Sequence, residues 1–151
     1  MKIKHQEMLS ETVKTLNIFG IENKDIMICG SISLDICGLF PPYRHEAHDV
    51  DVFIRCDEKK TKEIQDFIRT VNQLSNSTTK GSEAYTWTLE LKSGVIINIW
   101  FYNPDASFNT EMKLESGVWV QRPADCFSKK KSYGRVKDYR DLNNIAKMYL
   151  L

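Results

Sequence analysis

Two aspartates, Asp49 and Asp51, stand one residue apart in the apolar run HDVDVFI. In a β-strand, residues i and i+2 project from the same face, so the two carboxylates would point toward one place. Like charges held together repel unless a cation lies between them, and Mg²⁺ prefers oxygen ligands of this kind. The pair predicts a site for Mg²⁺ or Mn²⁺, while the same alternation also suits an amphipathic strand with one face in water.

Gly30 and Ser31 follow a short apolar run, residues 26–29, that is typical of a buried strand. A glycine at the end of a strand lets the backbone come close to a ligand, and the N–H groups at the start of a helix attract anions. A serine hydroxyl can complete such a phosphate site. The simpler interpretation is a turn in which Ser31 caps the next helix.

The order Gly-Ser, short helix, loop and Asp-x-Asp resembles the core motif of the nucleotidyltransferase superfamily, here CGSISLDICGLF and HDVDVFI. The resemblance implies a minimal, polymerase beta-like fold that moves a nucleoside monophosphate from a nucleoside triphosphate, expected to be ATP, to an acceptor hydroxyl. It implies that Gly30 and Ser31 hold the phosphates and that Asp49 and Asp51 ligate Mg²⁺ or Mn²⁺. The acceptor is left open among a small molecule, a protein and RNA.

The superfamily usually has a third carboxylate on a later strand, and the matching position in SGVIINIWFY is Asn98. An amide carries no charge and accepts no proton at neutral pH. Asn98 joins Asp49 and Asp51 as the expected catalytic set, and the alternative is a lapsed member that binds a nucleotide or a partner without turnover. Glu90, on the preceding strand, is either a replacement carboxylate or a solvent-facing residue.

The stretch from residue 122 to 150 resembles the tail of small bacterial nucleotidyltransferases related to abortive-infection toxins. That resemblance implies nucleotide binding by Lys131, Arg135 and Lys137, with Asp138 and Asp141 as its acidic residues. A carboxylate is favoured in the first turn of a helix, so a basic linker capped by Asp138 explains the same pattern.

Two other groups near these motifs have open interpretations. His45 and His48 are either solvated loop residues or part of an acceptor pocket. The aromatic residues of the later strands either pack in the core or stack on a base. They are Trp87, Trp100, Phe101, Tyr102 and Trp119.

Helices and a few strands must position these residues. Periodicity predicts helices over residues 3–18, 32–37, 61–74, 123–127 and 139–150. Alternation predicts strands over residues 26–29, 49–54, 85–91 and 95–102, with a second, short hairpin over 112–121. The polar stretch 75–82 is expected to be a loop. The expected fold class is α+β, with a small mixed β-sheet flanked by helices.

The bulk composition sets the remaining limits. A chain of 151 residues, 42% hydrophobic, is expected to form one domain over residues 1–151. Its 21 basic and 20 acidic residues nearly cancel, so net charge indicates no polyanion partner. Four cysteines without a CxxC pair are expected to be reduced. No apolar run approaches the roughly 20 residues of a membrane span, so the expected location is cytoplasmic, with no membrane contact and with a protein partner or a homo-oligomer left open.

Overall fold

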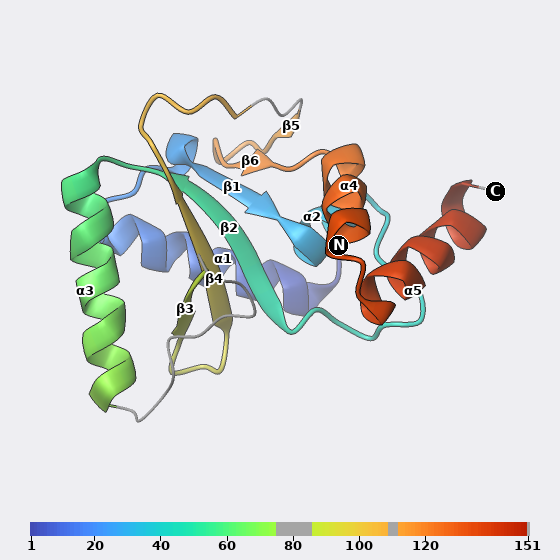
Figure 1. Cartoon of the computed structure of the whole chain (residues 1–151), viewed down its shortest axis with the longest axis horizontal. Helices are drawn as coiled ribbons and strands as arrows, with labels where there is room; N and C mark the ends of the chain where they lie inside the picture. The colour runs from blue at the N-terminus through green and yellow to red at the C-terminus, as the bar shows by residue number, and fades with distance from the viewer. Residues whose placement is uncertain (75–85, 109–111, 151) are drawn as a thin grey trace.

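The computed structural model describes residues 1–74, 86–108 and 112–150. At its centre is a six-stranded sheet with the order β3-β4-β2-β1-β6-β5 (Figure 1). The strands are β1 Ile26–Cys29, β2 Asp49–Arg55, β3 Trp87–Glu90, β4 Ile96–Tyr102, β5 Met112–Lys113 and β6 Trp119–Val120. The pairs β1·β6 and β2·β4 are parallel and the other neighbours are antiparallel. The α+β class with a small mixed sheet is therefore confirmed.

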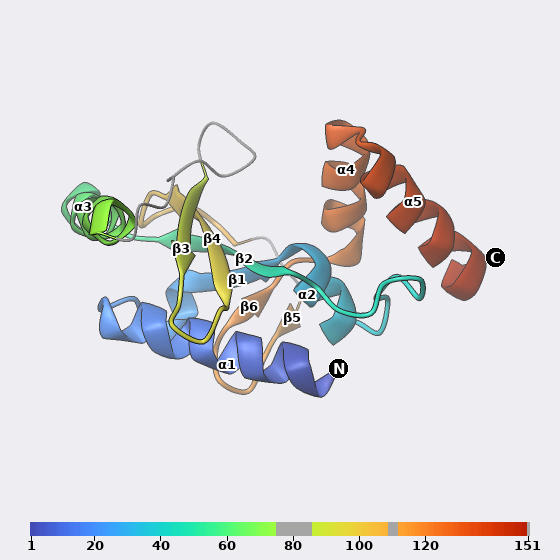
Figure 2. The same ribbon diagram turned by 90° about the horizontal axis from the view of Figure 1, so that it is seen from below.

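The helices flank this sheet on both sides. They are α1 Ile3–Ile18, α2 Gly30–Ile36, α3 Glu58–Leu74, α4 Pro123–Tyr133 and α5 Val136–Ile145, with a short turn η1 Asn23–Asp25 and a π-helical turn η2 Ala146–Leu150. Figure 2 shows α1 across one face of the sheet, with α4 and α5 together on the opposite side. In the described part of the chain, no helix is both long enough and apolar enough to cross a membrane.

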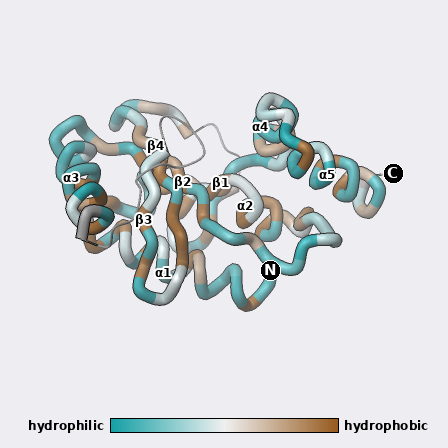
Figure 3. Tube along the Cα trace, turned by 60° about the horizontal axis from the view of Figure 1, so that its bottom comes forward, coloured by the Kyte–Doolittle hydropathy of each residue, from teal (hydrophilic) through white to brown (hydrophobic). Residues whose placement is uncertain are grey.

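The main hydrophobic core lies on one face of the sheet, where it packs against α1 and α3. The predicted alternation of β2 is confirmed: Val50, Val52 and Ile54 are fully buried in this core. Figure 3 shows hydrophobic residues concentrated along the central strands, while α3 carries both kinds around its axis. Since alternate residues of a strand face opposite ways, Asp49 and Asp51 lie on the other face, toward α4.

The residues of that other face form two parallel lines across the strands. The first, called here the polar row, joins Cys29, Asp51, Asn98 and Thr88, which are paired in register on β1, β2, β4 and β3. The second, called the aromatic row, joins Met27, Phe53 and Trp100 two residues further along the same strands. The candidate chemistry of this chain is therefore laid out by strand register.

Three helix starts differ from the prediction. Helix α2 begins at Gly30 rather than at residue 32, so Ser31 lies inside its first turn and is not the N-cap. Helix α3 begins at Glu58 because Asp57 Oδ1 accepts the backbone N–H of Lys60 at 2.7 Å and caps the helix. Helix α5 begins at Val136, just after Arg135.

The last part of the chain is more helical than expected. Helix α4 does not end near residue 127 but runs to Tyr133, because its lysines are good helix formers. It ends where Gly134 adopts a left-handed conformation, φ 61°. The two predicted hairpins are confirmed by the pairs β3·β4 and β5·β6. The predicted loop 75–82 and the start of the predicted strand at residue 85 lie outside the described residues.

Candidate functional site

The amide of Asn98 lies between the two predicted metal-binding aspartates. Its nitrogen donates to Asp49 Oδ2 at 2.8 Å and to Asp51 Oδ1 at 3.2 Å. Its oxygen accepts the hydroxyl of Thr88 at 2.8 Å, which fixes the direction in which the amide faces. The expected catalytic set is therefore brought together, with Asn98 acting as a hydrogen-bond donor to both carboxylates.

Asp51 is strongly affected by this environment. Burial, reinforced by the neighbouring carboxylate of Asp49, raises the pKa of Asp51 to about 7. The hydrogen bond from Asn98 and the charges of Lys137 and Lys130 act in the opposite direction but are outweighed. Near neutral pH a proton on Asp51 therefore competes with any divalent cation that this carboxylate would hold.

Gly30 comes very close to Asp51. A Cβ atom added at Gly30 would lie 2.3 Å from Asp51 Oδ2, and the backbone there has φ +64°. A side chain at position 30 would therefore fill the space beside the carboxylate. The Gly30 N–H donates to the buried Gln121 Oε1 at 3.2 Å, so this backbone donor already has a partner.

The donor set suits one divalent cation. Mg²⁺ is often held by one or two carboxylates while water and substrate phosphates supply the other oxygens. Among the described residues, no group of three or more His, Cys, Asp or Glu side chains is arranged to hold a metal. Asp49 and Asp51 could hold Mg²⁺ or Mn²⁺ as carboxylate ligands, whereas the Asn98 amide faces them with its nitrogen.

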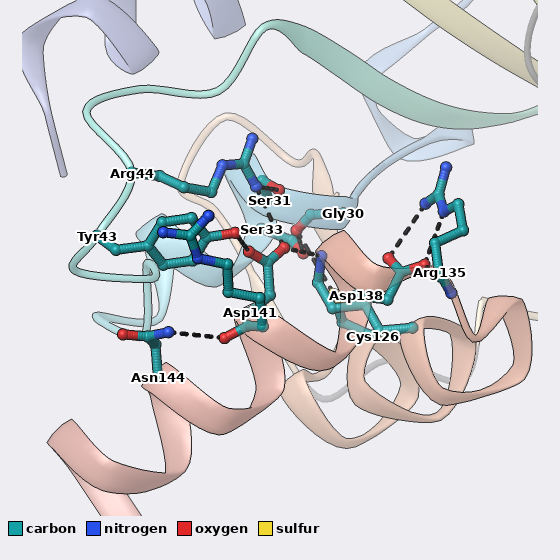
Figure 4. Close-up of polar contacts among 12 residues, drawn as sticks. Gly30, Ser31, Ser33, Tyr43, Arg44, Cys126, Arg135, Asp138, Asp141 and Asn144 are labelled. Atoms are coloured by element: carbon teal, nitrogen blue, oxygen red, sulfur yellow. Dashed lines mark hydrogen bonds and ion pairs between the residues drawn. The ribbon is translucent and has the colours of Figure 1, made fainter.

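Asp141 on α5 ties the neighbouring segments together. Fully buried, it pairs with Lys130 of α4 at 2.8 Å and with Arg44 at 3.3 Å, and it accepts the hydroxyl of Tyr43. Burial and this hydrogen bond raise the pKa of Tyr43 to about 12, which keeps the phenol a donor. Arg44 also donates to Ser31 Oγ at 2.8 Å, as Figure 4 shows. Asp141 thus links α4 and α5 to the loop 41–48, and Arg44 of that loop makes the contact with Ser31.

The predicted tail residues divide into two groups. Arg135 forms a capping box with the buried Asp138, donating through Nε at 2.7 Å. Burial acts to raise the pKa of Asp138, but the hydrogen bonds and charge of Arg135 outweigh it and hold that pKa below its ordinary value. Arg135 and Lys137 line the same pocket as the aspartates. Lys131 is exposed and does not line it.

A pocket of about 140 Å³ opens over the polar row and the aromatic row. The predicted residues that line it are Gly30, Ser31, His48, Asp49, Asp51, Asn98, Trp100, Arg135, Lys137 and Asp138. Its walls also include two thiols, Cys29 and Cys126. Burial raises the pKa of Cys29 well above the ordinary value and that of Cys126 to about 11, so both stay protonated at neutral pH and are poor nucleophiles.

Other candidates from the sequence lie elsewhere. Glu90 pairs with Ile96, as predicted, but its side chain is exposed and does not line the pocket. Ile96 in turn pairs with Asp49, so Glu90 is two strands away from that carboxylate. His45 is exposed. Four of the aromatic residues considered for base stacking do not line the pocket: Trp87, Phe101, Tyr102 and Trp119.

Several pocket residues were not predicted from the sequence. They are Cys29, Arg44, Phe53, Thr86, Gln121, Cys126, Lys129, Lys130 and Tyr133. The run KKK at 129–131 was expected in a basic linker, whereas it lies on α4, whose rotation decides which lysines face the sheet. Lys130 is buried against Asp141, and Lys129 lies over the aromatic row with its Nζ 3.9 Å from the Phe53 ring centroid.

Comparisons of this chain with known protein families, with curated proteins and with solved structures find no match.

Proposed function

We propose that this chain is a Mg²⁺-dependent nucleotidyltransferase with the minimal, polymerase beta-like fold. It moves a nucleoside monophosphate, with ATP as the expected donor, to a hydroxyl of a small molecule, a protein or an RNA. The observation that best supports this proposal is the convergence of Asp49 and Asp51 on one amide beside Gly30, beneath a pocket with basic walls. In a triphosphate with a divalent cation, the cation complements the two carboxylates and the phosphates complement the basic walls.

Several pocket residues have a direct role in this proposal. Asp49 and Asp51 hold the cation, which, when bound, neutralises charge on the triphosphate and on the leaving pyrophosphate. Lys137 lines the pocket, stands close enough to act on the pKa of Asp51, and is assigned to the phosphates. Ser31 accepts from Arg44 through its oxygen, so its own hydroxyl hydrogen is directed to a phosphate.

The reaction forms one bond and breaks one. The acceptor oxygen bonds to the α-phosphorus, and the bond from that phosphorus to the bridging oxygen breaks as pyrophosphate leaves. Asn98 cannot take the acceptor proton, because an amide is not a base at neutral pH. His48 lines the pocket and carries the imidazole suited to accept it and pass it to water.

A second candidate function follows from the same amide. Asn98 supplies the carboxylates with hydrogen bonds where a third carboxylate would supply a base and a metal ligand. The alternative is therefore a protein that binds the nucleotide without transferring it and acts through a partner.

Two measurements on the whole chain separate these functions. Calorimetric titration with ATP and Mg²⁺ reports binding, and pyrophosphate release across an acceptor panel reports transfer. We expect Asp49→Asn to weaken binding by about tenfold or more, the loss of one charge-assisted contact. Asp66→Asn, an exposed carboxylate on α3 paired with Arg69, is the matched control and should bind normally. Binding without release would favour the second candidate, and no binding of any triphosphate would contradict both.

A further inference from the structure

The line of the aromatic row continues to Thr86, the residue just before strand β3. Trp87 pairs with Ile99 and Thr88 with Asn98, so one more step of the antiparallel register sets Thr86 opposite Trp100. Thr86 and Thr88 share a face, because alternate residues of a strand project the same way. Phe53, Trp100 and Thr86 therefore lie in one line, and all three line the pocket that contains the aspartates.

Thr86 carries an unusual polar atom. The residue is only 9% exposed, and its buried Oγ1 has no hydrogen-bond partner in the described part of the chain. A buried hydroxyl without a partner is energetically unfavourable. Thr88, by contrast, gives its hydroxyl to Asn98. The hydroxyl of Thr86 is thus left for a group that enters the pocket.

Lys129 has no ion pair within the described residues, unlike the neighbouring cations. Its ammonium lies 3.9 Å from the ring centroid of Phe53 and 6.0 Å from that of Trp100. Lys130 and Arg135 are neutralised by buried carboxylates, whereas no carboxylate within the described ranges forms an ion pair with Lys129. A cation held on aromatic rings without a counter-ion is suited to an anion that arrives beside a planar group.

Trp100 offers a surface for such a planar group. It is half-buried and meets Phe53 edge to face, with centroids 5.5 Å apart and an interplanar angle of 76°. In that arrangement the two rings do not stack on each other. The polar and aromatic rows are two residues apart, or about 6.6 Å along a strand, which is close to the span from the phosphates of a nucleotide to its base.

We propose that Trp100, Thr86, Phe53 and Lys129 form a nucleobase subsite. The base stacks on Trp100, an atom on its edge bonds to the Thr86 hydroxyl, and a phosphate of the same nucleotide meets Lys129. This inference rests on the proposed function, since it places the base beside the cation site of Asp49 and Asp51. The base belongs either to the donor triphosphate or to a nucleotide acceptor, which present the same chemistry.

The test compares ligands with and without a base. ATP, inorganic triphosphate and AMP are titrated calorimetrically in the presence of Mg²⁺ into the whole chain and into the variants Trp100→Leu and Thr86→Val. Stacking of a base on an aromatic side chain is worth about five- to hundredfold in affinity. We expect Trp100→Leu to lose that factor for the ligand whose base occupies the subsite and to leave triphosphate within about twofold.

The variant Thr86→Val keeps the shape of the side chain and removes only the hydroxyl. It should weaken the same ligand severalfold while leaving the melting temperature equal or higher, because an unpaired buried group is gone. Trp87→Leu, on the opposite face of β3, is the matched control and should leave all three affinities unchanged.

Binding and competition experiments with AMP show whether the base belongs to the donor or to the acceptor. If AMP binds to protein already saturated with a non-hydrolysable ATP analogue, the subsite serves the acceptor, and if AMP competes with ATP, it serves the donor. The inference is overturned if triphosphate binds but neither variant changes the binding of ATP or AMP. Failure of the proposed function gives a different result, in which triphosphate itself does not bind, and it removes the inference as well.

Discussion

Burial and the neighbouring Asp49 together raise the pKa of Asp51. Its pKa of about 7 lies well above the ordinary value near 3.8, so the folded chain binds a proton there more tightly than the unfolded chain does. The stabilisation from this proton is complete below about pH 4 and is lost as the pH rises through 7. Above pH 7 the repulsion between Asp49 and Asp51 remains unless a cation relieves it.

Replacing Asp51 by Asn should therefore stabilise the cation-free protein at high pH. We expect a gain in the free energy of unfolding on the order of 2 kcal/mol at pH 8, shrinking toward zero as the pH falls to about 4. Urea unfolding in the presence of a chelator, repeated across this range, measures the difference. A gain that does not vary with pH would contradict the assigned cause, as would a loss of stability at pH 8.

Gly30→Ala tests the close approach between α2 and β2. The added Cβ would meet Asp51 Oδ2 at 2.3 Å, and the φ of +64° is unfavourable for any side chain. We expect a loss of about 1–3 kcal/mol in unfolding free energy together with weakened binding of ATP and Mg²⁺. Gly94→Ala is the control, since it has a positive φ but no atom within 4 Å of the added Cβ. Equal effects on nucleotide binding in the two variants would show that contact with Asp51 is unimportant.

His48→Gln tests the base assigned to the transfer reaction. Gln keeps a polar side chain in the pocket but accepts no proton at neutral pH. Loss of a general base typically costs about 100-fold or more in kcat, while the dissociation constant for ATP should stay within about twofold. Pyrophosphate release and calorimetry measure the two quantities. His45→Gln, an exposed histidine outside the pocket lining, should leave both unchanged.

Residue types predicted the polar centre of the pocket but only part of its walls. The alternation in HDVDVFI was enough to place Asp49 and Asp51 together on the face opposite the core. Arg44 and Asp141 come within 3.3 Å across 97 positions of the chain, a contact that no local pattern encodes. Lys131 was predicted for the pocket while its neighbour Lys130 faces Asp141, because the rotation of α4 is set by packing rather than by the sequence motif.

At the scale of elements, periodicity located the helices and strands more reliably than their ends. Helix α1 and strand β1 have the predicted bounds, since both carry a clear apolar pattern. The helix starts that differ depend on single contacts or on backbone conformation. Asp57 caps α3 and Gly30 adopts a positive φ, and neither effect changes the apolar period on which the prediction rests.

Asp141 should control how α4, α5 and the loop 41–48 are held together. Asp141→Ala leaves Lys130 and Arg44 beside a buried position without a counter-ion, so we expect a loss of about 3–5 kcal/mol in unfolding free energy. Urea unfolding measures it. Asp66→Ala removes an exposed pair with Arg69 and should cost less than about 1 kcal/mol. A similar small loss for Asp141→Ala would contradict the role given to this carboxylate.

At the scale of the whole molecule, the order of the strands was not predictable from the sequence. Neighbours along the chain do form the hairpins β3·β4 and β5·β6, as short polar turns indicate. The centre of the sheet instead joins β1 to β6 and β2 to β4 in parallel, through long connections. That arrangement is what brings Asn98 beside Asp51, so the site could be assembled only once the register was known.

Ligand binding should stabilise the whole fold, since the pocket is lined by β1, β2, β4 and α4 together. At a ligand concentration of 100 times Kd, the gain is about 2.7 kcal/mol, which corresponds to a rise in Tm of about 5–10 °C for a chain of this size. Thermal unfolding with ATP and Mg²⁺ together measures it. The rise should fall to about half or less in Asp49→Asn and persist in full in Asp66→Asn. A rise that is equal in both variants would place the ligand elsewhere.

The amide between the two carboxylates has one more consequence. A third carboxylate at position 98 would make the empty site a cluster of three negative charges, which only a bound cation could hold in shape. Asn98 instead keeps Asp49 and Asp51 in position through its own N–H groups, with Thr88 anchoring it from behind. The positions of the two carboxylates therefore do not require a bound cation. Under the proposed function, a nucleotide would bring its cation and take it away again, and the two carboxylates would stay in place for the next one.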